Sequence, residues 1–368
     1  MAAKKPIRRD TTVVKTGPLR APESRRLRYV MDDIRGIARH KHGKTFLYYS
    51  PRGLPIRNPS ELRRIKALAV PPAWTQVWIS PFANSHLQAT GRDAKGRKQY
   101  RYHRVWRELR DQTKYDHLLE FGRVLPKLRK QIAKDLSLPG LPRAKVMATI
   151  ARLLETTCIR IGNDEYARAN QSFGLTTLRN KHVKITGSKI RFRFRGKSGV
   201  IRNVDLNDRR LAQIVRRCQD LPGQELFQYL DENGRRRAVN SSDVNQYLRE
   251  ATGIDFTAKD FRTWAGTVLA ARALAELPPF ASKSQAKRNV VRAVERVAKK
   301  LGNTRAVCQN CYIHPAAVNA YFDGTLPETL SRPANASSAT LNNLSADEAA
   351  VTMILEESSK GVVEKKVA

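Results

Sequence analysis

The periodicity of apolar residues changes close to His103, and this change limits what the chain can fold into. Before it, short β-like runs at residues 45–49 and 76–80 are separated by Pro and Gly. After it, apolar residues such as Val146 and Ile150 recur at helical spacing. The sequence therefore predicts an α+β protein with a small, mainly β N-terminal domain and a larger, mainly α domain.

The helical part contains one β passage, between residues 175 and 206. Residues 190–195 read Ile-Arg-Phe-Arg-Phe-Arg, which is typical of a strand with one apolar and one basic face. Glycine-containing turns at residues 187–188 and 196–199 precede and follow it. We therefore expect a small sheet inside the helical domain, with residues 196–199 at a hairpin tip.

Capping residues predict the ends of several helices. A first helix is expected near residues 60–68 with Ser60 as its N-cap, and a second from Arg143 to Ile161, stopped by Gly162. Later helix starts are expected at Ser241/Ser242, Thr257, Ser282 and Thr304, with a stop at Gly302.

Four segments follow from these signals. Residues 1–27 are interpreted as a flexible basic arm and residues 28–110 as the β-rich domain. Residues 111–328 form the larger domain. Residues 329–368 are rich in Ser, Ala and Asn and are expected to be a disordered, low-complexity tail, with room for a short helix near residues 347–356.

The chain carries a formal charge of +36, from 69 Lys and Arg against 33 Asp and Glu. Such an excess repels itself in a folded protein and is typical of a protein that binds a polyanion, RNA or DNA. Because the basic residues are spread beyond the N-terminal arm, a neutral domain with a basic tail fits poorly. No apolar run approaches a membrane span and no signal peptide is seen, so we expect a cytoplasmic protein that associates with the nucleoid rather than with a membrane.

Several kinds of chemistry lack their usual motifs. No carboxylate cluster indicates a two-metal site, and no phosphate-binding loop indicates an ATP-driven motor. Cys308 and Cys311 form a C-x-x-C pair with His314 nearby, but a fourth zinc ligand is missing, so we interpret all four cysteines as reduced thiols. The sequence predicts no metal, no cofactor and no small-molecule substrate.

Several short strings, in one order, carry more information than any one of them. Together they resemble the type IB DNA topoisomerases, specifically the poxvirus-like enzymes found in bacteria, over about residues 28–321. The strings are residues 159–167 (IRIGNDEYA), 174–178 (GLTTL), 194–199 (FRGKSG), 259–264 (KDFRTW), 301–304 (LGNT) and 312–315 (YIHP).

The resemblance implies a fold and an activity. The larger domain would have the catalytic fold shared with tyrosine recombinases, including a three-stranded sheet. The protein would be a monomer that relaxes supercoiled duplex DNA through a transient 3′-phosphotyrosyl link, without ATP or metal.

The resemblance also assigns roles to five residues. Tyr312 would be the nucleophile, and Arg160 and Arg262 would hold the transferring phosphoryl group, which a guanidinium fork suits chemically. Lys197 would protonate the leaving 5′-oxygen. Asn303 stands where many relatives have His; its amide can still donate a hydrogen bond but cannot carry charge.

DNA contacts are implied as well. Residues 95–102 (KGRKQYRY) resemble the strand of the N-terminal domain that contacts DNA, and Tyr166 resembles a DNA-facing tyrosine of the catalytic domain. Glutamine and tyrosine can read base edges or bind phosphates. The expected contacts of the N-terminal domain are Lys95, Arg97, Gln99, Tyr100 and Tyr102.

Two other functions stay open at this point. A tyrosine recombinase would share the nucleophile, but its H-x-x-R is Lys259-x-x-Arg262 here and its L-G-H is L-G-N. A non-catalytic architectural DNA-binding protein would explain the charge alone.

Overall fold

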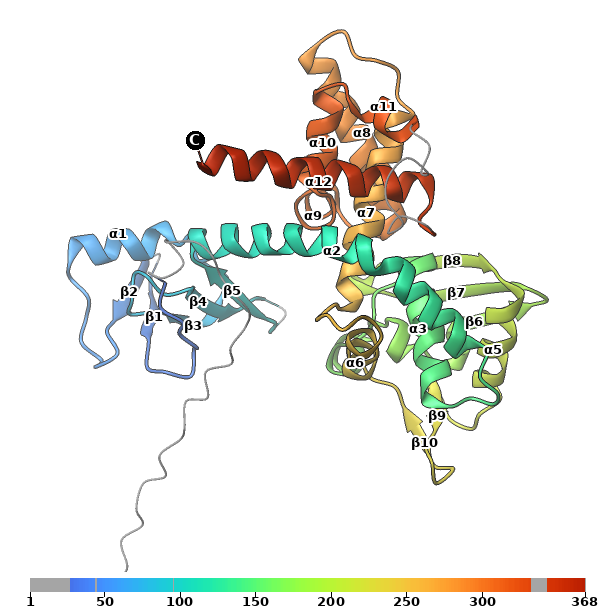
Figure 1. Cartoon of the computed structure of the whole chain (residues 1–368). Coiled ribbons are helices and arrows are strands. Elements are labelled where there is room, and N and C mark those ends of the chain that lie inside the picture. The colour runs from blue at the N-terminus through green and yellow to red at the C-terminus, as the bar shows by residue number, and fades with distance from the viewer. Residues whose placement is uncertain (1–26, 44, 95, 332–342, 368) are drawn as a thin grey trace, which may run out of the picture. The chain divides into compact units, whose positions relative to one another are not determined.

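The computed structural model describes residues 27–43, 45–94, 96–331 and 343–367. The chain divides into two compact units, Met1–Lys114 and Tyr115–Ala368 (Figure 1). The division falls inside helix α2, Arg104–Leu136.

The first unit is built on a five-stranded antiparallel sheet with the strand order β2-β1-β3-β4-β5. Its small core consists of apolar side chains from three strands and one helix, including Ile37, Ile65 and Ile79. The predicted mainly β domain is confirmed. Its elements are β1 (Ile37–His42), β2 (Thr45–Tyr49), α1 (Pro59–Ala67), β3 (Thr75–Ile79), β4 (Leu87–Arg92) and β5 (Lys98–Tyr102).

The N-cap of α1 differs from the prediction. Asn58, not Ser60, is the cap: its side-chain oxygen accepts hydrogen bonds from the backbone N–H groups of Ser60 at 2.9 Å and Glu61 at 3.3 Å. Pro59 occupies the first helical position, where its fixed φ and missing N–H cost nothing, so the helix begins before Ser60.

The second unit contains the predicted three-stranded sheet, with antiparallel strands in the order β6-β7-β8. The alternation at residues 190–195 is confirmed: Ile190, Phe192 and Phe194 are buried and the arginines between them are exposed. The elements of the sheet are β6 (Val183–Thr186), β7 (Lys189–Arg195) and β8 (Ile201–Asn207), with the short turn Lys197–Gly199 between the last two.

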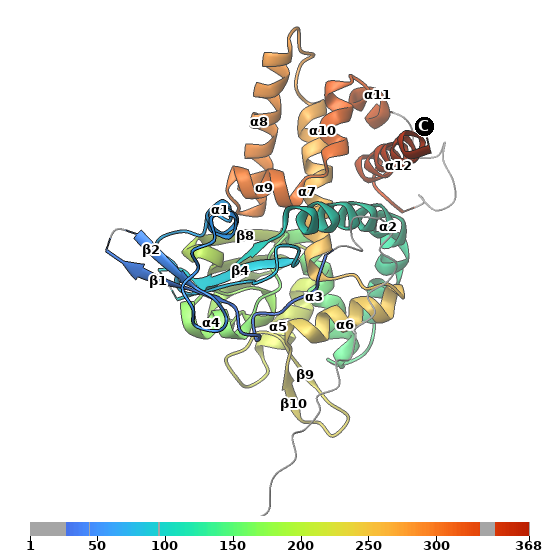
Figure 2. The same ribbon diagram turned by 90° about the vertical axis from the view of Figure 1, so that its left-hand side faces the viewer.

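Helix α7 is the central element of the second unit, because it contacts α3, α8, α9, α10, α11 and α12. Figures 1 and 2 both show α7, α8 and α10 side by side. Apart from α2, the helices are α3 (Arg143–Thr157), α4 (Asp164–Asn170), α5 (Arg209–Gln219), α6 (Ser241–Thr252), α7 (Ala258–Ala275), α8 (Lys283–Leu301), α9 (Arg305–Tyr312), α10 (Pro315–Phe322), α11 (Leu326–Ser331) and α12 (Ala346–Val367), with a hairpin of β9 (Gln228–Leu230) and β10 (Arg236–Ala238).

Most of the predicted helix ends in this unit are confirmed. Thr257, Ser282 and Thr304 are N-caps, and Gly302 ends α8 with a φ of +63°. The predicted end of α3 is wrong. The helix stops at Thr157, and Cys158 takes a left-handed conformation with a φ of +54°, four residues before Gly162. Residues 159–163 therefore form an irregular segment that connects α3 to α4.

The sequence predicts a disordered tail with room for a short helix near residues 347–356. The structure has a helix there that is longer than predicted, α12 at residues 346–367, so the prediction of disorder is wrong for this stretch, while residues 332–342 of the tail lie outside the described residues. The apolar face of α12, including Val351, Ile354 and Leu355, is buried in the core of the second unit. A capping box starts this helix: Ser345 and Glu348 each accept a hydrogen bond from the other's backbone N–H, at 3.3 and 2.9 Å. None of the described helices has the length and apolar character that a bilayer span needs.

Candidate active site

Arg160 lies in the irregular segment between α3 and α4. Backbone hydrogen bonds from residues 175 and 176 hold this segment in place. The N–H of Leu175 donates to the carbonyl of Arg160 at 2.8 Å, and the N–H of Thr176 to that of Ile161 at 2.7 Å. Gly174 permits this contact, because a β-carbon there would lie 2.5 Å from the Arg160 carbonyl oxygen. The sequence strings at residues 159–167 and 174–178 are therefore joined by backbone hydrogen bonds.

Arg262 lies in the second turn of α7 and is only 3% exposed. Its two terminal nitrogens donate to the carbonyl of Cys158 and, at 3.0 Å, to that of Leu301, while its buried Nε has no hydrogen-bond partner among the described residues. Its Cζ lies 4.9 Å from the centroid of the Tyr312 ring. A buried guanidinium without a carboxylate partner is costly for folding and indicates a functional reason for its position.

Asn303 follows the last turn of α8 and contacts Arg160. Its side-chain oxygen accepts a hydrogen bond from Nη2 of Arg160. Its buried Nδ2 has no hydrogen-bond partner within the described parts of the chain, so two amide N–H donors lack acceptors there. Burial, and then the charge of Arg262, lower the pKa of Arg160 to about 10, which leaves the guanidinium protonated at neutral pH.

Tyr312 is the last residue of α9, and α7 holds the backbone that follows its side chain. The N–H of His314 donates to Oγ1 of the fully buried Thr267 at 3.1 Å. The Tyr312 side chain lies near enough to Arg160 to act to raise the pKa of that guanidinium, against the effect of burial. The structure thus brings Tyr312 together with Arg160, Arg262 and, through Arg160, Asn303.

Lys197 is exposed on the turn between β7 and β8 and lines a small pocket with Arg160 and Arg262. Arg202 of β8 lines the same pocket and was missed by the sequence analysis. None of the described side chains that line it is acidic. A pocket with four cations and no carboxylate on its wall suits an anion with several oxygens, such as a phosphodiester.

The cysteine pair next to Tyr312 is not arranged as a zinc site in the described residues, where no three His, Cys, Asp or Glu side chains form a metal-binding group. Cys308 is buried and Cys311 exposed. His314 is the N-cap of α10, and its Nδ1 accepts the N–H of Ala316 at 3.0 Å.

The predicted DNA contacts of the first unit lie on and beside β5, except Lys95, which lies outside the described residues. The side chains of Arg97 and Gln99 both donate to Asp93, at 2.8 and 2.9 Å. Tyr100 is 47% exposed, and its ring stacks against that of Tyr102 with the centroids 6.0 Å apart. In the second unit, Tyr166 is exposed on α4.

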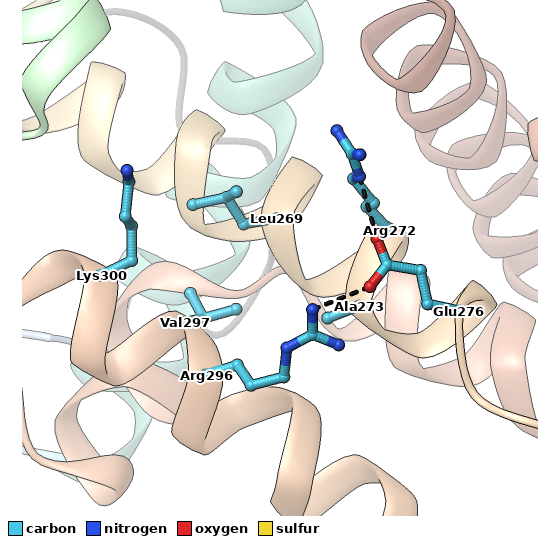
Figure 3. Close-up of a pocket in the computed structure, with 7 residues that line it drawn as sticks. All are labelled: Leu269, Arg272, Ala273, Glu276, Arg296, Val297 and Lys300. Atoms are coloured by element: carbon cyan, nitrogen blue, oxygen red, sulfur yellow. Dashed lines mark hydrogen bonds and ion pairs between the residues drawn. The ribbon is translucent and has the colours of Figure 1, made fainter. Parts of the chain in front are cut away.

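A different pocket lies between α7 and α8 (Figure 3). Glu276 bridges Arg272 and Arg296 there, at 3.1 and 2.8 Å. None of the predicted catalytic residues lines it, and its arginines are already paired with a carboxylate. It is therefore a weaker candidate for phosphate chemistry than the pocket around Lys197.

Comparison with known proteins adds an independent result. Residues 103–325 match the family described as eukaryotic DNA topoisomerase I, catalytic core, and residues 45–93 match bacterial DNA topoisomerase IB, N-terminal domain. DNA topoisomerase 1B of Acanthamoeba polyphaga mimivirus is 34% identical over 295 residues, covering 78% of this chain and 88% of the viral protein. DNA topoisomerase 1B of vaccinia virus (strain Copenhagen) is 21% identical over 262 residues, covering 70% of this chain and 79% of its own.

Proposed function

This chain belongs to the type IB DNA topoisomerase family, and from that membership we propose the catalytic roles of its residues. Tyr312 attacks a phosphodiester of duplex DNA and forms a 3′-phosphotyrosyl link, while the 5′-oxygen leaves. After the free strand swivels, the 5′-hydroxyl attacks the phosphotyrosine, reseals the strand and releases Tyr312. Because the phosphotyrosyl bond conserves the free energy of the broken phosphodiester bond, the strand can be resealed without ATP.

One observation carries this proposal. The ring of Tyr312 lies against the buried guanidinium of Arg262, which has no carboxylate partner in the described parts of the chain, and Arg160 and Asn303 lie beside it. In the phosphorane-like transition state negative charge grows on the non-bridging oxygens. Preorganised cations and N–H donors stabilise such charge most effectively in a site that excludes water. Nε of Arg262 and Nδ2 of Asn303, which have no acceptor among the residues that the structure describes, are donors suited to those oxygens.

Proton transfers complete the cycle. The phenolic proton of Tyr312 passes to water as the phosphorus–oxygen bond forms, and Lys197 donates a proton to the departing 5′-oxygen. In resealing, the neutral amine of Lys197 takes the proton back from the attacking 5′-hydroxyl, and the departing Tyr312 oxygen takes a proton from water. The place of Lys197 on the pocket wall with both arginines supports this role.

A relaxation assay on supercoiled plasmid, with chelator and without ATP, tests the proposal. The parent protein should relax the plasmid and form a covalent adduct with DNA. Tyr312→Phe should lose both, while Tyr229→Phe, a partly buried tyrosine of the same unit, should keep both. Relaxation or adduct formation by Tyr312→Phe would contradict the mechanism.

The same assay separates the other two functions. A tyrosine recombinase would need paired sites and would exchange strands between two duplexes. An architectural protein would bind the plasmid without any covalent adduct, even in the parent chain.

We further propose that a bacterial cytoplasm is where this enzyme acts on nucleoid DNA, as a monomer. The match of residues 45–93 to a bacterial N-terminal domain and the charge of +36 support this. DNA contacts would come from Arg97, Gln99, Tyr100 and Tyr102 of the first unit and Tyr166 of the second. If so, Tyr100→Ala should weaken duplex binding in a binding titration without changing the cleavage rate at saturating protein.

A further inference from the structure

Arg202 occupies a position where the strand pattern calls for an apolar side chain. Along β8, Arg202 faces the same side of the sheet as Val204 and Leu206, which pack against the core. Its register partner on β7 is the buried Phe194. A long cation on the inner face of a strand costs desolvation free energy, so its place needs a reason beyond sheet packing.

Two glycines make room for this side chain. A β-carbon on Gly196 would lie 3.0 Å from Cγ of Arg202, and a β-carbon on Gly302 would lie 2.0 Å from its Nη1. Gly196 directly precedes Lys197, and Gly302 directly precedes Asn303. The side chain of Arg202 therefore lies against both turns that carry predicted catalytic residues.

A hydrogen bond to helix α8 holds the guanidinium group of Arg202 in place. Nη2 of Arg202 donates to the carbonyl of Lys300 in the last turn of α8, at 3.0 Å. A cation at a helix C-terminus is stabilised by the exposed carbonyls and by the helix dipole. Burial, and then the charge of Arg262, lower the pKa of Arg202, in agreement with its place on the wall of the cationic pocket.

We propose that Arg202 is a positioning residue that holds the turn of Lys197 against the end of α8. Lys197 lies on an exposed hairpin turn, and Ser198 and Gly199 beside it have positive φ values. Such a turn has little packing of its own to hold an ammonium group at the leaving 5′-oxygen. Arg202 supplies the missing connection between this turn and the rigid helical part that carries Tyr312.

The inference rests on the proposed role of Lys197, and the test uses the leaving group to isolate it. A duplex with sulfur in place of the 5′-bridging oxygen at the cleavage site has a leaving group of much lower pKa, which departs without a general acid. Arg202→Met keeps an unbranched stem between the two glycines and removes the guanidinium. We expect its single-turnover cleavage of the oxygen substrate to fall about tenfold or more, and that of the sulfur substrate by less than about threefold. Arg202→Lys should fall between Arg202→Met and the parent.

Two controls make the outcome decisive. Arg191→Ala removes an exposed arginine of the same sheet that is paired with Asp205, and it should cleave both substrates like the parent. Lys197→Ala should cleave the oxygen substrate slowly and should cleave the sulfur substrate at close to the parent rate. If Lys197→Ala recovers and Arg202→Met does not, or if Arg202→Met cleaves oxygen at the parent rate, the role of Arg202 is wrong. If Lys197→Ala itself fails to recover, the proposed acid is wrong.

Discussion

Gly266 of α7 lies so close to Tyr312 that a β-carbon on it would be 2.3 Å from the Tyr312 carbonyl oxygen and 3.1 Å from the Tyr312 Cβ. Glycine in the middle of a helix normally costs about 1 kcal/mol relative to alanine, so this position gives up helix stability for close approach. The absent side chain sets how near α9 lies to Arg262.

Gly266→Ala should therefore reduce cleavage although it raises helix propensity. The added methyl group pushes the backbone of Tyr312 away, and displacement of a reacting group by about 1 Å can cost about 100-fold in rate. Single-turnover adduct formation at saturating protein measures this. Ala265→Gly, which lowers the propensity of the same helix without adding an atom, is the control and should cleave at the parent rate. Equal rates for Gly266→Ala and the parent would show that this contact does not place the nucleophile.

Asn303 should act as a hydrogen-bond donor rather than as a structural link. Loss of one preorganised donor to a transition-state oxygen costs about 100-fold in kcat, which is the loss expected for Asn303→Ala. Asn303→Asp keeps the acceptor for Arg160 but removes the donor and adds negative charge, so it should be slower than Asn303→Ala. Asn303→His should keep most of the parent rate. A faster Asn303→Asp than Asn303→Ala in the cleavage assay would contradict the donor role.

Arg160→Lys should make cleavage depend on pH. Burial and the charge of Arg262 lower the pKa of the parent guanidinium only to about 10, so it stays charged near neutrality. A lysine begins from a lower ordinary pKa, and the same surroundings shift it further down, so the ammonium loses its charge as the pH rises. The cleavage rate of Arg160→Lys relative to the parent should fall between about pH 7 and about pH 9. For Arg191→Lys this ratio should stay constant, and a constant ratio for Arg160→Lys would refute the prediction.

Helix α12 should contribute to stability through Glu348. This carboxylate forms an ion pair with Arg129 at 2.7 Å and accepts a hydrogen bond from Nε1 of Trp264 at 3.1 Å. Trp264 lies on α7, two residues after Arg262. Arg129 keeps its other ion pair, with Glu155 at 2.6 Å, so Glu348→Gln removes one charged partner of two and should lower the free energy of unfolding by about 2 kcal/mol at neutral pH. Glu356→Gln, which breaks the more exposed pair with Arg123 on the same helix, should cost less than about 1 kcal/mol.

The effect of Glu348→Gln should also depend on pH. Burial acts to raise the pKa of Glu348, but the hydrogen bonds from Arg129, Ser345 and Trp264 lower it below its ordinary value. A carboxyl whose pKa is lowered by folding stabilises the protein above its unfolded pKa and loses that contribution as the pH falls through the folded value. The difference between parent and variant in denaturant melts should therefore shrink below about pH 4. A difference that stays the same down to pH 3 would assign the effect to packing.

Local patterns in the sequence predicted the elements that local forces determine. The alternation at residues 190–195 specified β7, and Thr304 and Gly302 specified the adjoining ends of α9 and α8, because strand faces and helix caps depend on residues a few positions apart. The order of the short strings predicted the family, which the comparisons confirmed. Two features that local sequence also specifies were not among the predictions. One is the capping box of Ser345 and Glu348, and the other is the position of Arg202 on the same face of β8 as Val204 and Leu206.

Only the tertiary structure decided the arrangement of the site. No local pattern places Arg160 against Asn303, 143 residues away, or aims Arg262 at the carbonyl of Cys158, 104 residues away. The early end of α3 at Thr157 and the need for glycine at position 266 likewise depend on atoms from distant segments. The sequence by itself determined which residues could perform phosphoryl transfer. Packing around α7 determined which of them meet, because close approach and buried donors depend on three-dimensional neighbours rather than on spacing along the chain.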